Sequence, residues 1–261
     1  MRLSASGASH ASRRHSFALT VTAPAALADI NGFDPSGFAY HQSDVRTPAS
    51  MVPGGMRLTD ASGPETRSLW FTQQQDISSF ACSFTYRLGN FTWSGGTSGI
   101  ALVFQNSNSG TGWVSPGAFP SNVGYAGLDH SAAITLEIDG GPGLTRSGYY
   151  SNGATGGSSP AVLPVNAYNQ TDIFVSMSYN GSILTLDMND GPGGHVWATQ
   201  HLLVGSISST IGSSSAFIGF TAGTAAGTEQ LITDFHFGAI PTPGAMFLAG
   251  VACLTATRRR R

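Results

Sequence analysis

An alternation of apolar and polar residues with a period of two is the feature that most restricts how this chain can fold. It is clearest over residues 80–88, where the apolar positions are Phe80, Cys82, Phe84, Tyr86 and Leu88. Successive side chains of a strand point to opposite faces, so this pattern predicts a strand with one buried face. It also places Cys82 in the core as a small apolar residue rather than as a reactive thiol.

Other segments of the chain have the same strand-like character, and no helical pattern of useful length separates them. They are 56–60, 68–72, 99–105, 132–139, 172–179, 182–188, 215–221 and 230–237. The pair Asn180-Gly181 predicts a type I′ hairpin turn between two of them. The segments 106–122 and 140–169 are rich in Gly, Ser, Pro and Asn. They are long connections, in which binding residues are often found.

The composition supports an all-β chain. Only 10% of the residues are charged, and the chain has 34 glycines, which excludes a helical bundle. Many strands without crossover helices predict one domain built from two antiparallel sheets, a sandwich or jelly roll.

The charge distribution restricts the partners. All 12 basic residues are Arg, and residues 29–239 hold five of them against all 14 Asp and Glu, a net charge of −9. A body of this charge repels nucleic acid and suits neutral or cationic partners. The two cysteines, Cys82 and Cys253, are too few for a disulfide framework or a zinc site.

Residues 1–28 have the features of an export signal peptide. Basic residues precede an apolar stretch over 17–27, and Ala26-Leu27-Ala28 forms a small-x-small cleavage site before Asp29. The run 12–17 resembles a twin-arginine signal with its Phe one place late, so the export route stays open. A disordered N-terminus is the alternative.

Residues 240–261 form a second segment of targeting type. Pro241-Thr242-Pro243 precedes an apolar run over 245–257, and four arginines close the sequence. This arrangement resembles the bacterial PEP-CTERM sorting signal, with Pro-Thr-Pro in place of Pro-Glu-Pro. The resemblance implies contact with the membrane and the exosortase sorting machinery, removal of the tail, and a location in the cell envelope, at the cell surface or in the extracellular matrix. A helix of 13 residues reaches about 20 Å, less than the roughly 30 Å hydrocarbon core.

The order of the motifs between these ends resembles one family. The motifs are 56–59, 79–86, Gly99-Ile100-Ala101-Leu102-Val103-Phe104-Gln105, Gly124-Tyr125-Ala126-Gly127-Leu128, Leu136-Glu137-Ile138-Asp139, 175–179 and 218–224. Together they resemble the L-type (legume-type) lectin domain in family order. The resemblance implies that residues 29–239 form a concanavalin A-like jelly roll, a sandwich of two antiparallel sheets.

The same resemblance implies a function, which is carbohydrate binding without catalysis by an exported lectin-like domain whose partners are glycans or exopolysaccharide. Ser98 stands where the family has its sugar-binding Asp, and Gly124 matches the glycine whose backbone N–H helps to bind the sugar. The remaining candidates for sugar contact are Tyr125, Tyr149, Asn152 and Thr224.

Glu137 and Asp139 are the candidate metal ligands. They lie two apart on a predicted strand, so both carboxylates leave one face. The matching family positions bind calcium with manganese. The ligand set is incomplete here, because the next carboxylate is Asp172 and Arg146 adds positive charge nearby. The alternative is that the two acids are solvated or pair with Arg146.

Two alternatives to sugar binding are catalysis and loss of function. Glu137-Ile138-Asp139 is similar to the start of the Glu-x-Asp-x-x-Glu motif of jelly-roll glucanases, but Gly141 and Pro142 stand where the second glutamate belongs. Without a second acid the glycosidase chemistry lacks a proton donor, so the protein is not expected to be an enzyme. The other alternative is a structural or adhesive domain that kept the lectin fold and lost its sugar and metal binding.

Overall fold

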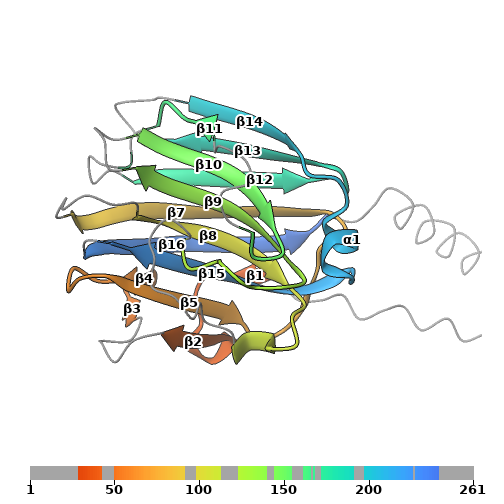
Figure 1. Ribbon diagram of the computed structural model, residues 1–261, viewed down its shortest axis with the longest axis horizontal. Coiled ribbons are helices and arrows are strands. Elements are labelled where there is room, and N and C mark those ends of the chain that lie inside the picture. Colours follow the sequence, from red (N-terminus) through yellow and green to blue (C-terminus); the bar gives the residue numbers. More distant parts are fainter. Residues whose placement is uncertain are drawn as a thin grey trace, which may run out of the picture.

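A computed structural model gives the fold (Figure 1). It describes residues 29–42, 50–91, 98–112, 123–139, 144–154, 161–165, 167, 172–190, 197–225 and 227–240. The predicted signal peptide and most of the predicted sorting segment therefore lie outside the described residues. Within the described ranges no helix has both the length and the hydrophobicity needed to cross a membrane.

Two antiparallel sheets lie face to face, each with eight strands. Sheet A contains, in spatial order, β14 (Trp197–Leu203), β13 (Ile183–Asn189), β12 (Ile173–Tyr179), β7 (Phe80–Phe91), β16 (Thr228–Ala239), β4 (Gly55–Thr59) and β3 (Ser50–Val52), with β1 (Ile30–Asn31) paired to β16. Sheet B contains β11 (Ala161–Val162), β10 (Leu144–Ser151), β9 (Ser131–Asp139), β8 (Ser98–Gln105), β15 (Ser215–Thr224), β5 (Glu65–Phe71) and β2 (Phe38–Gln42), with β6 (Gln75–Asp76) paired to β15.

Helical structure in the described ranges is confined to three short elements. These are η1 (Pro35–Gly37), η2 (Gly110–Gly112) and α1 (Ile207–Ile211). Ser206 caps α1 by accepting a hydrogen bond from the Ser209 N–H, and Gly212 ends the helix in a left-handed conformation at φ +75°. Ile207 and Ile211 bury one side of α1 against the core.

The main core fills the space between the sheets. Aromatic rings form its centre, and Phe80 packs on Phe104, Tyr179 and Phe237 with centroids 4.8 to 5.3 Å apart. Cys82 belongs to this core at 4% exposure, as predicted, and burial raises the pKa of its thiol. Burial of apolar surface on this scale is the main stabilising contribution to a sandwich fold.

The structure confirms the two-sheet architecture and each strand predicted from the sequence, with ends moved by up to three residues. It also has strands that the sequence did not predict, among them β10 and β14. The hairpin between β12 and β13 is confirmed, but its turn differs from the prediction. Asn180 pairs with Ile183 and only Gly181 has positive φ, of +99°, so the two loop residues are Gly181 and Ser182. That sign pattern is the one of a type II′ turn.

A second, smaller apolar cluster covers the outer face of sheet B. It contains Trp70, Ala101, Val103, Val123, Tyr125, Leu128, Ala133 and Tyr150. The loop 123–128, which lies between β8 and β9 in the sequence, covers this outer face and contributes Val123, Tyr125 and Leu128 to the cluster. Strand β8 is therefore buried on both faces over its whole length.

Candidate functional site

The loop 123–128 is held to sheet B by two sets of hydrogen bonds. The Thr221 hydroxyl donates a hydrogen bond of 2.8 Å to the carbonyl of Val123. The Tyr125 hydroxyl lies 2.8 Å from the Ser131 hydroxyl and accepts a bond of 3.1 Å from the Gly153 N–H. The loop that carries the predicted glycine and tyrosine is thus part of the packed domain.

Gly124 has a φ of +73°, a conformation that favours glycine. A Cβ atom there would lie 2.8 Å from the carbonyl oxygen of Ala222 and 2.8 Å from the Thr66 methyl group. The sequence predicted that this position is glycine because a sugar approaches its backbone closely. The contacts with β15 and β5 already require glycine at this position, so its presence does not depend on a ligand.

Tyr125 does not offer an aromatic surface to a ligand. Its side chain is 1% exposed, inside the second apolar cluster. Burial, the largest cause, raises the pKa of Tyr125 to about 12. The tyrosine holds the loop to sheet B, which corrects its predicted role as a sugar contact.

Ser98 and Thr224 are brought together, as the lectin resemblance implies, but inside the sandwich. The Ser98 hydroxyl donates to that of Thr224 at 3.1 Å, and Thr224 accepts a second bond of 2.9 Å from the Thr228 N–H. Both residues are at most 2% exposed and point between the sheets. Neither hydroxyl is open to a sugar, and this corrects their predicted role as direct contacts.

These hydroxyls belong to a buried polar network at the end of the sandwich where β8 begins, called here the Ser98 end. Gln230 lies at its centre, with its amide nitrogen donating to the Thr59 hydroxyl at 3.0 Å and its amide oxygen accepting from Tyr86 at 2.9 Å. A fully bonded network of this kind stabilises a single arrangement of the strands that supply it.

Tyr149 and Asn152 do not join the other candidates. Tyr149 packs against the core between the sheets, while its neighbour Tyr150 occupies the outer face of sheet B. Asn152 is exposed, with a φ of +52°, and its N–H donates to the carbonyl of Ser131 at 2.8 Å. Ser131 is the first residue of β9 and marks the opposite end of the sandwich, the Ser131 end, about 23 Å from Ser98 along the strand.

Glu137 is half-buried on the outer face of sheet B, directly across the ladder from Arg146. Burial is the main cause that raises the pKa of Tyr150 to about 12, and the charge and hydrogen bonding of Glu137 add to it. Glu137 thus interacts with Tyr150 beside the second apolar cluster. This placement agrees with the interpretation of Glu137 as a paired acid better than with a metal ligand.

The side chain of Asp139, the second candidate ligand, lies outside what the structure describes, as do the loop 140–143 and the residues Trp93 and Trp113. Within the described ranges no three His, Cys, Asp or Glu side chains come together as a metal site. Glu137 is therefore the one predicted ligand whose side chain can be placed.

Comparison with solved structures identifies the architecture. Lectin II from Ulex europaeus superposes with a TM-score of 0.64 and 16% identity, over 83% of this chain and 100% of that one. The fold is that of the legume lectins. The exoplasmic/lumenal domain of VIP36, in a Ca2+/Man3GlcNAc-bound form, matches with a TM-score of 0.57 and 15% identity, over 79% of this chain and 87% of that one. No family model and no curated protein sequence matches the chain.

The legume-lectin fold also includes proteins described as lectin-like. Arcelin-5, a lectin-like defense protein from Phaseolus vulgaris, matches with a TM-score of 0.59 and 13% identity, over 80% of this chain and 96% of that one. Identities of 13 to 16% establish a common fold and leave ligand binding to be argued from the residues.

Sequence reasoning missed one open surface of the described domain, the outer face of sheet A. Two adjoining hollows lie there, with volumes of about 340 and 360 Å³. One signal could have pointed to this surface. Strand β12 alternates strictly between buried and exposed positions, and Phe174 is a large apolar ring at an exposed one.

Proposed function

We propose that the protein binds carbohydrate without changing it, as a lectin-like domain exported to the cell envelope. The observation that carries this proposal is the match of the fold to lectins over almost their entire length, including one whose complex contains Man3GlcNAc. The body of the chain has a strong negative charge, which disfavours nucleic acid and suits uncharged ligands.

The proposed ligand region on sheet B is the outer face near Glu137, beside the loop 123–128. Glu137, which the sequence predicted as a metal ligand, is half-buried there, and a carboxylate is a stronger hydrogen-bond acceptor for sugar hydroxyls than a neutral oxygen. The proposal needs no metal ion, because Glu137 interacts with Tyr150 and within the described ranges no three His, Cys, Asp or Glu side chains come together.

The test is a glycan array with the full chain, in calcium and in EDTA. We expect weak retention of at least one glycan, near the millimolar range of about −4 kcal/mol that a shallow site supports. Display of many copies on one surface would strengthen the attachment. Glu137→Gln should weaken this retention about tenfold, and Asp129→Asn, a change of an exposed acid at the Ser131 end, should not.

A structural or adhesive domain without sugar binding is the second candidate function. The burial of Ser98, Thr224 and Tyr125 favours it, because these predicted contacts are used inside the fold. An array on which the wild-type chain retains no glycan in either condition would leave this second function as the better one.

Export and sorting are tested separately by intact-mass measurement on the protein recovered from the envelope of a producing bacterium. We expect the chain to begin at Asp29 and to lack Arg258 to Arg261. A mass that includes both terminal segments would contradict the proposed processing, and recovery from the cytoplasm would contradict the proposed location.

A further inference from the structure

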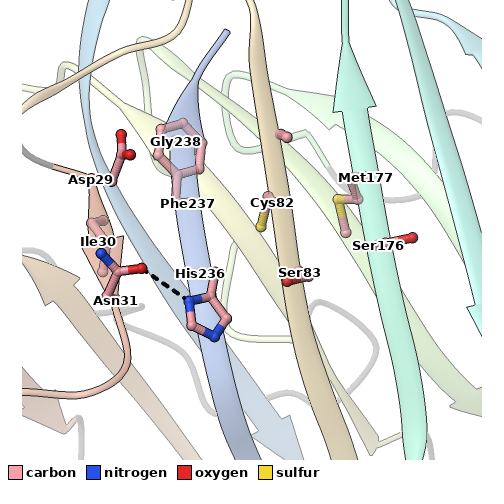
Figure 2. Close-up of a pocket in the computed structure, with 11 residues that line it drawn as sticks. Asp29, Ile30, Asn31, Cys82, Ser83, Ser176, Met177, His236, Phe237 and Gly238 are labelled. Atoms are coloured by element: carbon pink, nitrogen blue, oxygen red, sulfur yellow. Dashed lines mark hydrogen bonds between the residues drawn. The ribbon is translucent and has the colours of Figure 1, made fainter.

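The outer face of sheet A carries a groove that the proposed lectin site does not use. The two hollows share Ser83, Ser176 and His236 and so form one continuous depression. Figure 2 shows the first hollow, in which the His236 ring turns toward Asn31 while Ser83 and Ser176 lie on neighbouring strands. We call this depression the sheet A groove.

The groove exists because two adjacent small side chains lie between larger ones across the sheet. One row of cross-strand partners runs over six strands, and its members are Thr199, Asp187, Ser176, Ser83, His236 and Asn31. Directly paired residues point to the same face of a sheet. The two serines therefore form a low floor between a carboxylate on one side and an imidazole on the other.

A second row of cross-strand partners lies next to the first and contains one aromatic residue, Phe174. Phe174 pairs with Asn189 on one side and with Thr85 on the other. Its ring is 44% exposed, although it sits in the middle of the sheet. An exposed ring beside hydroxyl and amide groups offers a face on which an apolar surface can stack.

The carboxylates at the two sides of the groove are oriented by neighbouring hydroxyls. Thr199 donates to one oxygen of Asp187 at 2.7 Å, and Thr233 donates to one oxygen of Asp234 at 3.0 Å. Asp234 lies at a bulge of β16 and has a φ of +53°, which turns its side chain toward this face. Each of these bonds uses one of the two oxygens of its carboxylate.

The backbone of the floor is already paired. Strand β7 is bonded to β12 and β16, and β12 is bonded to β7 and β13. A peptide that adds to a sheet needs the open main-chain groups of an edge strand, and these two floor strands have none. Recognition must therefore come from side chains, which here are hydroxyls, amides, carboxylates, one imidazole and one aromatic ring.

We infer that the sheet A groove binds a neutral polysaccharide strand, at a site separate from the proposed one on sheet B. Sugar hydroxyls match the acceptors Asp187, Asp234 and Asn189, and the apolar face of one sugar ring matches Phe174. The groove follows the strands, so it suits an extended chain of sugars rather than a single one. The choice of sugar as ligand class rests on the proposed function, whereas the location of the site does not.

The experiment is affinity electrophoresis of the full chain through gels that contain a soluble β-glucan, a mannan or a galactan. We expect at least one polysaccharide to retard the wild type. Phe174→Ala should weaken the binding at least about tenfold, and Ser176→Tyr, which fills the floor, should abolish it. The control Leu203→Ala changes an apolar residue of the same sheet that is 85% exposed outside the groove, and it should be retarded like the wild type. A single cooperative melting transition in each variant would show that the variants fold.

Three outcomes would overturn the inference. If Glu137→Gln loses retardation while Phe174→Ala and Ser176→Tyr keep it, the groove is not the site and the proposed function stands. If no polysaccharide retards the wild type while the glycan array retains a glycan, the groove proposal fails and the proposed function stands; if the array retains none either, both fail. If the chain instead binds an oligo-arginine peptide in a salt-sensitive way that Asp187→Asn abolishes, the groove takes a cationic partner and not a glycan.

Discussion

The two outer faces of the sandwich differ although both are built from strands of the same period. On sheet B, Ala101, Val103 and Ala133 point outward and are covered by the loop 123–128. On sheet A, the outward residues of β7 and β12 include Ser83 and Ser176, and within the described ranges no loop covers them. Sheet B therefore has the outward residues of β8 covered, whereas sheet A leaves the outward residues of β7 and β12 open.

This difference shows that the outward residues of a strand decide whether a sheet needs a cover. Small apolar side chains at outward positions lower the free energy only when something excludes water from them. Small hydroxyl side chains remain solvated and leave a polar hollow instead. The two faces should respond differently to substitution, and the following predictions test that from the largest expected effect to the smallest.

Trp70→Ala on sheet B and Phe174→Ala on sheet A remove an outward aromatic ring from each face. Trp70 is fully buried, so its loss should lower the free energy of unfolding by about 3–5 kcal/mol. Phe174 is 44% exposed, and its loss should cost less than about 1.5 kcal/mol. Urea unfolding measures both values. Equal losses would mean that the two faces are covered alike.

Gly124→Ala should loosen the cover of sheet B, and Gly127→Ala is its matched control. Both glycines have positive φ, of +73° and +84°, and each alanine should cost about 1 kcal/mol for the backbone alone. Only Gly124 has a backbone oxygen 2.8 Å from the new Cβ, which should add about 1–3 kcal/mol. Hydrogen exchange of the amide of Leu128 should speed up in the first variant and not in the second.

Glu65 tests the Ser98 end, where both sheets meet. Burial, its largest influence, raises the pKa of Glu65 above its usual 4.5, although Arg67 and the Asp60 N–H both donate hydrogen bonds to it. The folded state then holds the proton more tightly than the unfolded chain. Lowering the pH from 7 toward 4.5 should therefore stabilise the wild type relative to Glu65→Gln.

The control for this pH effect is Asp34, whose pKa is lowered from 3.8 by hydrogen bonds from Ser36. Here the wild type should lose stability relative to Asp34→Asn as the pH falls through 3.8. Urea unfolding at several pH values gives both slopes. Slopes of the same sign would contradict the assignment of Glu65 as a buried acid.

Removal of divalent cations should have the smallest effect. The core between the sheets contains neither Glu137 nor Asp139, so EDTA should change the melting temperature by no more than about 3 °C, the equivalent of roughly 1 kcal/mol. Differential scanning calorimetry of the full chain with calcium and with EDTA measures this. A fall of tens of degrees would mean that a cation holds the cover of sheet B in place.

The sequence predicted the parts of the fold that depend on local alternation. Strand β7 is the clearest case, because its apolar residues fall on one face without interruption. Strand β10 was missed, since it reads as a Gly- and Ser-rich loop and owes its structure to pairing with β9. The tertiary context supplies what its own propensity does not.

The candidate site was predicted less well, because the direction of a side chain at the edge of a sandwich depends on register. Ser98 was placed beside Thr224 correctly, but both lie on the inward side of their strands, the side of Ile100 and Ala222. A shift of one residue exchanges the two faces of a strand. The order of the family motifs predicted where the candidate residues lie along the chain. The pairing of the strands in the structure was needed to show which side of the sheet their side chains face.

The pairing of β1 with β16 brings the two ends of the described domain together. Ile30 lies opposite Phe237, and the Ile240 N–H donates to the carbonyl of Ser79 at 3.0 Å. When the two ends of a domain lie close together, the chain can be circularly permuted without changing its contacts. A short linker could join residue 240 to residue 29, and new termini could be opened between Gly181 and Ser182. This circular permutation would keep every strand pair and move both chain ends to the hairpin of β12 and β13.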